Sequence, residues 1–85
     1  MNIDDFVKNF SELFEEADST NFTPLTRFRD IEEWSSLLAL SAIAMVDDKY
    51  RIKITGDNLR EADIIEDIFK IVRKKQAELL EGFRK

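Results

Sequence analysis

Two adjacent serines, Ser35 and Ser36, stand at the start of a long apolar stretch and carry hydroxyls that could do chemistry. A serine hydroxyl becomes a catalytic nucleophile only beside a base, and the chain contains no histidine and no cysteine. That absence also excludes thiol catalysis, disulfide bonds and zinc sites built from cysteine and histidine. We therefore expect a protein that is not an enzyme. Taken alone, the two serines indicate a helix cap, because serine is common at that position.

The composition narrows the class of protein further. The chain has 85 residues, with 18 acidic and 13 basic side chains and a net charge of −5. This length allows a single domain over residues 1–85, and the negative charge argues against binding nucleic acid. The N-terminus lacks the features of a signal peptide, and the longest apolar stretch, residues 37–46, is too short to span a bilayer. We expect a cytoplasmic protein that does not insert into membranes.

The charge is distributed unevenly along the chain. Residues 1–34 hold nine acidic and three basic side chains, whereas residues 35–85 hold nine acidic and ten basic ones. Such charges usually lie on solvated helix faces, which is the interpretation that we prefer here. The last part of the chain is the most basic, through Lys70, Arg73, Lys74, Lys75, Arg84 and Lys85.

Helical spacing of apolar residues predicts a first helix that follows Asn2 as its N-cap and fades near Ala17. A long connection over residues 18–34 comes next, with turn signals before and at Pro24. Its apolar residues recur at intervals, so we expect them to pin this connection onto the core: Phe22, Leu25, Phe28 and Ile31.

The stretch from Ser35 to Tyr50 predicts a second helix with two apolar stripes. A helix that is apolar nearly all round is either buried or meets a partner, and an 85-residue domain cannot bury it on every side. We therefore expect one stripe to face the core and the other to face a partner. The core stripe comprises Ala39, Ala42, Ile43, Val46 and Tyr50, and the partner stripe comprises Leu37, Leu40 and Ala44.

Residues 51–85 are expected to form an extended loop followed by further helix. Residues 51–54 alternate like a strand but have no partner strand, so we interpret them as extended loop. Asp57 is expected to cap a short helix over residues 58–62, and Asp63 with Glu66 resembles a capping box for a last helix. The predicted fold is all-α: a bundle of three main helices plus one short helix, with a long loop between the first two. The core is expected over residues 3–72, with residues 73–85 as a basic helical extension or tail.

This order of elements, with Ser35-Ser36-Leu37 opening the second helix, resembles the acyl carrier protein family. The resemblance covers about Ile3 to Val72 and is strongest from Phe28 onward. The family has Asp-Ser-Leu at this position, often preceded by tryptophan in one subgroup, and here Trp34 stands before the serines. The spacing to the following features also agrees with the family: Tyr50, Ile52, Ile54, Asp57 and Leu59.

The resemblance implies a carrier function. In the family, the serine before leucine, here Ser36, receives 4'-phosphopantetheine from coenzyme A through a separate phosphopantetheinyl transferase. The arm's thiol then holds acyl intermediates as thioesters for fatty acid, polyketide or related biosynthesis. Ser35 is the N-cap beside the attachment point, and the chain is expected to be a monomer. The partners would be acyl-loading, acyl-transfer or condensing enzymes, which would bind Leu37, Leu40, Ala44, Asp47 and Asp48.

An acyl cargo is expected to lie between helices, among apolar residues that the sequence places on their inner faces. These residues are Ile43, Val46, Ile54, Leu59, Ile64 and Ile68.

Two departures from the family pattern leave alternatives open. Ser35 replaces the family's aspartate, which keeps a helix cap but removes a carboxylate, and this favours an unmodified carrier-like interaction module as an alternative. Leu38 and Ser41 stand where the family often has acids, which favours a specialised carrier with its own partners. An aminoacyl or peptidyl carrier, and an adaptor that binds through basic residues 70–85, are further possibilities.

Overall fold

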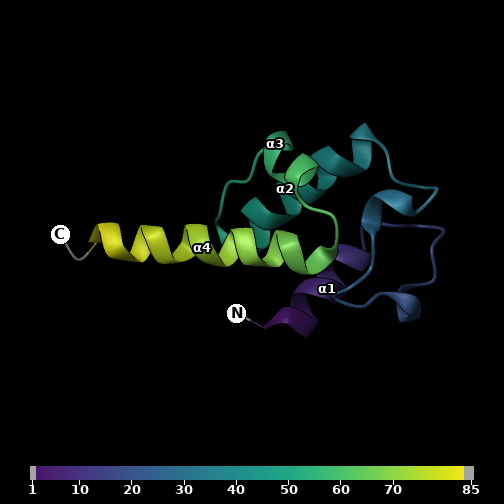
Figure 1. Cartoon of the computed structure of the whole chain (residues 1–85), viewed down its shortest axis with the longest axis horizontal. Coiled ribbons are helices and arrows are strands. Elements are labelled where there is room, and N and C mark those ends of the chain that lie inside the picture. The colour runs from purple at the N-terminus through teal and green to yellow at the C-terminus, as the bar shows by residue number, and fades with distance from the viewer. Residues whose placement is uncertain (1, 84–85) are drawn as a thin grey trace.

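The computed structural model describes residues 2–83 and shows a bundle of helices (Figure 1). The predicted all-α fold, with three main helices, one short helix and a long loop between the first two, is confirmed. Met1, Arg84 and Lys85 lie outside the described residues. The helices are α1 (Ile3–Ser11), α2 (Ser36–Tyr50), α3 (Gly56–Glu61) and α4 (Ile65–Phe83), with short 3-10 turns at Ser19–Asn21 and Phe28–Asp30.

Helix α1 begins where the sequence predicts, because the Asn2 side chain accepts hydrogen bonds from the Asp4 and Asp5 backbone N–H groups. It ends at Ser11, six residues before the expected end near Ala17. Beyond Ser11 the chain forms a tight turn, in which the Phe14 N–H group donates to the Ser11 carbonyl oxygen at 3.1 Å. The apolar spacing continues past this point because Phe14 packs against the connection rather than along a helix face.

The core joins all four helices and the connection between α1 and α2. Phe28, in the middle of that connection, is fully buried, as are Phe6 and Phe10 of α1. Of the four residues expected to pin the connection, Phe22 and Ile31 are partly buried, but Leu25 is 69% exposed and the expectation for it is wrong. The buried residues of α2, α3 and α4 complete the core: Ala42, Met45, Val46, Leu59, Ile65, Ile68, Phe69 and Val72.

Residues 51–54 form an extended loop between α2 and α3, as predicted. Arg51 ends α2 in the left-handed conformation, with φ at 58°, and turns the chain into this loop. Ile52 and Ile54 of the loop are buried, so alternate side chains face the core. Helix α3 then begins at Gly56 and is capped by Thr55, not by Asp57 as expected.

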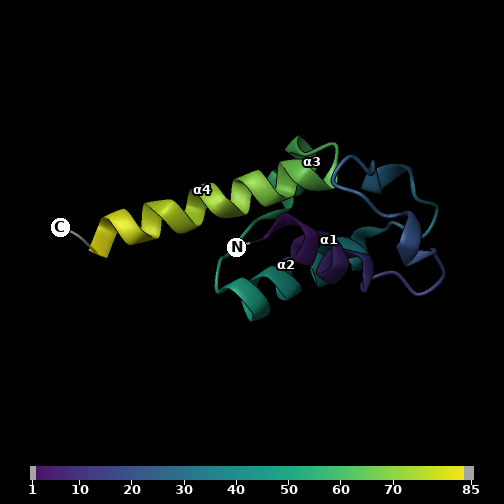
Figure 2. The same cartoon turned by 90° about the horizontal axis from the view of Figure 1, so that it is seen from below.

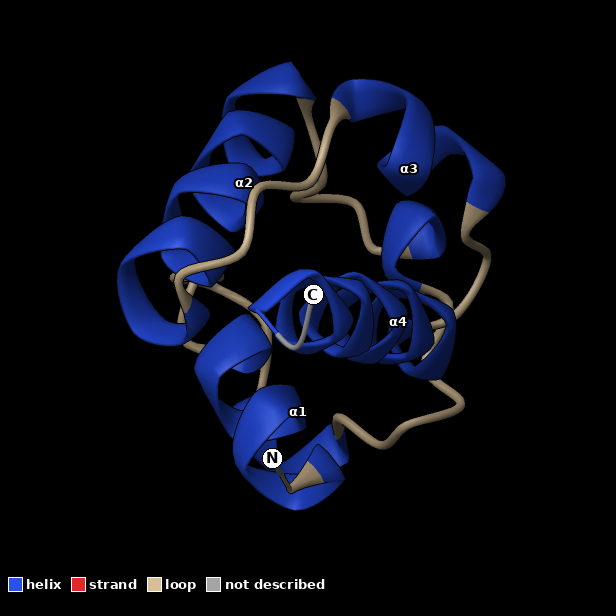
Figure 3. Ribbon diagram, turned by 90° about the vertical axis from the view of Figure 1, so that its left-hand side faces the viewer, coloured by secondary structure: helices blue, strands red, loops and turns tan. Residues whose placement is uncertain are grey.

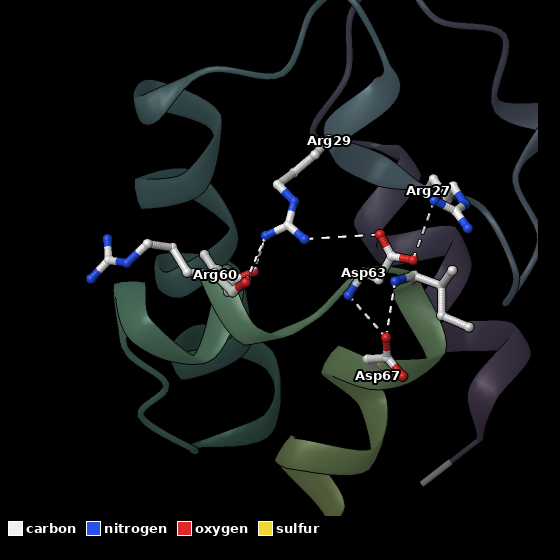
Figure 4. Close-up of polar contacts among 7 residues, drawn as sticks. Arg27, Arg29, Arg60, Asp63 and Asp67 are labelled. Carbon is white, nitrogen blue, oxygen red and sulfur yellow. Dashed lines mark hydrogen bonds and ion pairs between the residues drawn. The ribbon is translucent and has the colours of Figure 1, made fainter.

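The expected capping box of Asp63 and Glu66 is wrong, because α4 begins with a different arrangement. The Asp67 carboxylate accepts hydrogen bonds from the backbone N–H groups of Asp63 at 2.9 Å and Ile64 at 3.1 Å (Figure 4). These two hydrogen bonds lower the pKa of Asp67, since they stabilise the ionised carboxylate.

The first N–H groups of α4 are satisfied by the long connection. Ile65 N–H donates to the Thr26 carbonyl oxygen at 3.1 Å, and Glu66 N–H donates to the Pro24 carbonyl oxygen at 2.9 Å. A helix start needs acceptors for such groups, and here a distant segment supplies them. The connection therefore contributes to the helical bundle through its backbone as well as its side chains.

Helix α4 extends well beyond the rest of the bundle. Figures 1 and 2 show its C-terminal half pointing away from the other helices, and the molecule is 45 Å along its longest axis. Val72 is fully buried, whereas residues 77–82 are exposed. The expected helical extension after residue 72 is present as far as Phe83. Viewed from that end, the other helices surround the base of α4 (Figure 3).

Candidate functional site

Ser36 is the first residue of α2 and is exposed. Ser35 before it is the N-cap, as predicted, and its hydroxyl oxygen accepts a hydrogen bond from the Leu38 N–H group at 3.3 Å. The Ser35 hydroxyl is thus engaged in capping the helix. The Ser36 hydroxyl has no hydrogen bond to any of the residues 2–83 that the structure describes. Both serines are exposed, so they differ in the hydrogen bond that the Ser35 hydroxyl accepts and not in their accessibility.

An open hollow of about 310 Å³ lies beside Ser36, between the start of α2 and helix α3. Two arginine side chains line it, and they bring positive charge to a helix N-terminus, where backbone N–H groups already favour anions. The remaining lining is mainly apolar or small. The hollow is lined by Arg29, Trp34, Ser35, Ser36, Ala39, Gly56, Leu59 and Arg60.

Arg29 connects the long loop to the end of α3. Its Nη1 atom donates to the carbonyl oxygens of Leu59 at 3.2 Å and Arg60 at 2.8 Å, and its Nη2 atom lies 3.9 Å from an Asp63 carboxylate oxygen (Figure 4). These contacts hold the guanidinium group at the edge of the hollow. The Arg60 side chain is more exposed and forms an ion pair with Asp57.

These two arginines were not predicted as part of a site. Arg29 and Arg60 lie 31 residues apart, on segments that meet only after folding. Arg29 could have been noticed only as a basic residue beside the apolar Phe28 in a loop. That pattern is too common in sequences to identify a binding group. The pairing depends on how α3 lies against the connection.

Trp34 forms one wall of the hollow and also anchors the connection. Its ring lies 5.0 Å from the Phe28 ring and 6.1 Å from the Phe10 ring, centroid to centroid. A third ring, that of Phe14, lies 6.2 Å away. Such aromatic contacts fix the ring orientation, so the wall beside Ser36 is held by the core itself.

The predicted partner stripe of α2 lies at the surface. Leu37 is 72% exposed and Leu40 is 64% exposed, and Ala44 is exposed as well. Asp47 and Asp48 follow on the same helix, and both are exposed. We call these five residues the α2 outer face. The opposite stripe faces the core, where Ala42 and Val46 are fully buried and Ala39, Ile43 and Tyr50 are partly buried.

The residues expected to surround an acyl cargo belong mostly to the packed core. Val46, Ile54, Leu59 and Ile68 are buried, and each is a member of the one hydrophobic cluster that joins the helices. Two others on the expected list, Ile43 and Ile64, are partly exposed.

Glu33 has a structural position close to the site. Its carboxylate accepts hydrogen bonds from the backbone N–H groups of Glu15 at 2.7 Å, Glu16 at 2.9 Å and Ala17 at 3.3 Å. These hydrogen bonds lower the pKa of Glu33, because they favour the charged form. The carboxylate therefore ties the segment after α1 to the residues that lead into α2.

Comparisons with known proteins return no family: no protein-family model, curated protein or solved structure matches this chain. The acyl carrier resemblance therefore rests on the residue pattern alone. Across residues 2–83, no group of three or more potential ligand side chains is arranged to hold a metal ion. No helix within that range combines the length and the apolar character needed to cross a membrane.

Proposed function

We propose that this protein is a discrete acyl carrier whose Ser36 hydroxyl receives 4'-phosphopantetheine from coenzyme A, with 3',5'-adenosine diphosphate as the leaving group, in a reaction catalysed by a separate transferase. The observation that carries this proposal is an exposed serine at the first position of α2, beside a hollow that contains two arginines. The proposal also agrees with the absence of cysteine, because the thiol that holds the acyl group would arrive with the arm.

The residues around the hollow fit the proposed group. Its phosphodiester is an anion, and Arg29 and Arg60 with the N-terminus of α2 supply positive charge around Ser36. Trp34, Ala39 and Leu59 offer apolar surface to the start of the arm. Once attached, the arm supplies a thiol that carries acyl groups as thioesters. The chain's own residues would bind the phosphate and orient the arm along the surface between α2 and α3.

Partner enzymes would bind the α2 outer face. Leu37 and Leu40 offer apolar contact, and Asp47 and Asp48 offer charge that would complement a basic surface. We propose acyl-loading, acyl-transfer or condensing enzymes as these partners, in fatty acid, polyketide or related biosynthesis.

The decisive experiment is intact-protein mass spectrometry after incubation with coenzyme A, Mg²⁺ and a broad-specificity phosphopantetheinyl transferase. We expect one phosphopantetheinyl group on the wild-type protein and none on Ser36→Ala. Ser41→Ala, which removes another serine of α2, is the matched control and should be modified like the wild type. An unmodified wild-type protein, or a modified Ser36→Ala variant, would contradict the proposal.

A second candidate function is a non-covalent interaction module that keeps the carrier-like fold without the arm. Ser35 supplies a cap hydroxyl where the carrier family has a carboxylate, and the exposed Leu37 and Leu40 are available in the unmodified protein. With a purified partner enzyme, this function predicts binding that survives Ser36→Ala and is lost in Leu37→Ser with Leu40→Ser. The carrier function predicts instead that turnover by the enzyme requires Ser36.

A further inference from the structure

The C-terminal part of α4, residues 73–83, forms a projecting segment that we call the α4 extension. It adds 11 residues and about 16 Å of helix beyond the last buried side chain, Val72. Leu79 is 55% exposed and Leu80 is 59% exposed. Figures 1 and 2 both show this segment clear of the other helices among the described residues 2–83.

The apolar side of the α4 extension continues the side of α4 that packs into the core. Ile65, Ile68 and Val72 are buried, and Leu79 follows Val72 by seven residues, which is two helical turns. Lys75 and Gln76 occupy the helical turn between Val72 and Leu79, so the apolar side of α4 is interrupted there and resumes at Leu79 beyond the edge of the bundle. Exposed apolar side chains gathered in a stripe of this kind are typical of an interaction surface.

An open hollow of about 510 Å³ lies along this stripe, between the α4 extension and the loop after α2. Ile52 and Leu79 give it apolar surface, and Lys75 crosses it to donate from Nζ to the Lys53 carbonyl oxygen at 3.0 Å. We call it the basic-rimmed hollow, because three of its lining side chains are cationic. Its lining residues are Arg51, Ile52, Lys53, Lys75, Glu78 and Leu79.

Charge along the α4 extension changes sign in the direction of the chain. Arg73, Lys74 and Lys75 come first, and Glu78 and Glu81 follow. Two such segments side by side in the same direction would place like charges together. In the opposite direction, the basic part of each lies against the acidic part of the other, which is the arrangement that electrostatics favours.

From this complementarity we propose that two copies of the chain pair through antiparallel α4 extensions, in place of the monomer that the family resemblance implies. Leu79 and Leu80 of each copy cover the apolar stripe of the other, along its basic-rimmed hollow. Glu78 and Glu81 of each copy then lie near the basic rim of the other. An antiparallel pair has two-fold symmetry, so the same surface serves both copies and the assembly closes as a dimer.

The proposed dimer is a weak one. Each α4 extension is only 11 residues long, so the buried area falls in the range of small, transient interfaces. We therefore expect dissociation in the range of about 10–100 µM, where monomer and dimer coexist at ordinary working concentrations. The inference is independent of the modification of Ser36, which lies at the opposite end of α2 from the Arg51 side of the hollow.

Sedimentation velocity of the full chain over a series of concentrations tests the inference. We expect a reversible monomer–dimer equilibrium that Leu79→Ser with Leu80→Ser shifts at least tenfold toward monomer. Both leucines are exposed in the single chain, so this variant should keep its helical circular dichroism. The matched control is Leu37→Ser with Leu40→Ser, which changes an equally exposed pair on α2 and should leave the dimer intact.

Charge exchange gives a second, sharper test. Lys74→Glu with Lys75→Glu makes the extension mainly acidic, and Glu78→Lys with Glu81→Lys makes it entirely basic at the five charged positions. Each variant alone should be monomeric, because like charges then face one another. An equimolar mixture should form the heterodimer. Self-association of either variant at the wild-type strength would overturn the charge pairing.

Three outcomes overturn the inference as a whole. The first is the absence of a wild-type dimer at every concentration up to about 1 mM, which is about ten times the upper end of the expected dissociation range. Species larger than a dimer would indicate head-to-tail association of the basic extension with the acidic first part of the chain. A protein that stays monomeric but co-sediments with phosphatidylglycerol vesicles, and loses this with Leu79→Ser and Leu80→Ser, would assign the stripe to a lipid surface.

Discussion

The long connection between α1 and α2 and the α4 extension are opposites in structure. The connection has almost no regular helix, yet its rings are packed: Phe22 lies 5.1 Å from Phe14, which precedes the connection, and Phe28 lies 5.0 Å from Trp34, between centroids. The α4 extension is a regular helix whose two leucines are more than half exposed. Regular backbone and burial are therefore separate properties, and in this chain the irregular segment carries more of the core.

The physical reason lies in where each segment finds its partners. Backbone groups of the connection bind other elements, as when Thr26 and Pro24 accept from the first N–H groups of α4. A helix satisfies most of its backbone internally, and water can bind the carbonyl groups of its last turn, so the α4 extension needs no neighbouring segment for its own N–H and C=O groups. Its side chains remain available for another molecule.

The largest expected effect follows from the contrast in burial. Phe28→Ala removes a fully buried ring from the connection and should lower the free energy of unfolding by about 3–5 kcal/mol. Leu79→Ala in the α4 extension should change it by less than about 0.5 kcal/mol at concentrations where the chain is monomeric. Urea unfolding followed by circular dichroism measures both. Equal effects would mean that the extension is part of the folded core.

A smaller effect is expected where the connection contacts α3. Arg29→Ala removes the hydrogen bonds to the Leu59 and Arg60 carbonyl oxygens and should cost about 1–2 kcal/mol. Arg27→Ala is the control, because Arg27 has only an exposed ion pair with Asp63 and should cost less than about 0.5 kcal/mol. Urea unfolding measures the free energy of unfolding of both variants. A larger decrease for Arg27→Ala than for Arg29→Ala would contradict the role given to the Arg29 hydrogen bonds.

The end of the connection gives the next prediction. Ser35→Ala removes the N-cap hydrogen bond of α2 and should cost about 0.5–1 kcal/mol, since the bond to Leu38 N–H is long at 3.3 Å. Ser36→Ala removes an exposed hydroxyl from the next position and should be close to neutral for stability. Thermal unfolding distinguishes them. Equal losses would show that Ser36 also has a capping role.

The smallest effect concerns pH. Hydrogen bonds from Glu15, Glu16 and Ala17 lower the folded-state pKa of Glu33 below its ordinary value of 4.5. The ionised Glu33 carboxylate therefore stabilises the folded state fully above the unfolded-state pKa, and this stabilisation is lost as the pH falls through the folded-state pKa. Melting temperatures measured at neutral and at acidic pH test this. The melting temperature of Glu33→Gln should fall less on acidification than that of the wild type. Glu32→Gln, on the exposed neighbour, should behave like the wild type.

The sequence predicted the helices whose apolar spacing and caps are local. Asn2 and Ser35 both cap as expected, because such caps depend on residues two or three positions away. The predictions failed where distant segments decide the outcome. The end of α1 is such a case, since Glu33 accepts the N–H groups of residues 15–17 from a position 16–18 residues later.

The capping residues predicted for α3 and α4 also differ from those in the structure. Thr55 and Asn58 form a reciprocal capping box at α3, but the usual pattern has Glu or Gln in the second position, so Asp57 was the apparent cap. At α4, Asp67 rather than Glu66 accepts the hydrogen bonds that were expected.

The candidate site also has a part that depends on local sequence and a part that depends on distant segments. The exposed serine and the α2 outer face were predictable because they lie on one helix and follow its periodicity. The hollow beside Ser36 was not, since Arg29 and Trp34 reach it from the connection and Arg60 reaches it from α3. Its existence depends on how the connection is held against α3.

Trp34 gives the protein an internal optical reporter. It is the only tryptophan in the chain, and its indole is in contact with the connection's rings on one side and borders the hollow beside Ser36 on the other. Its emission wavelength therefore responds to undocking of the connection and to any group that enters the hollow. A titration or a modification at Ser36 can be followed in the unlabelled protein by fluorescence alone.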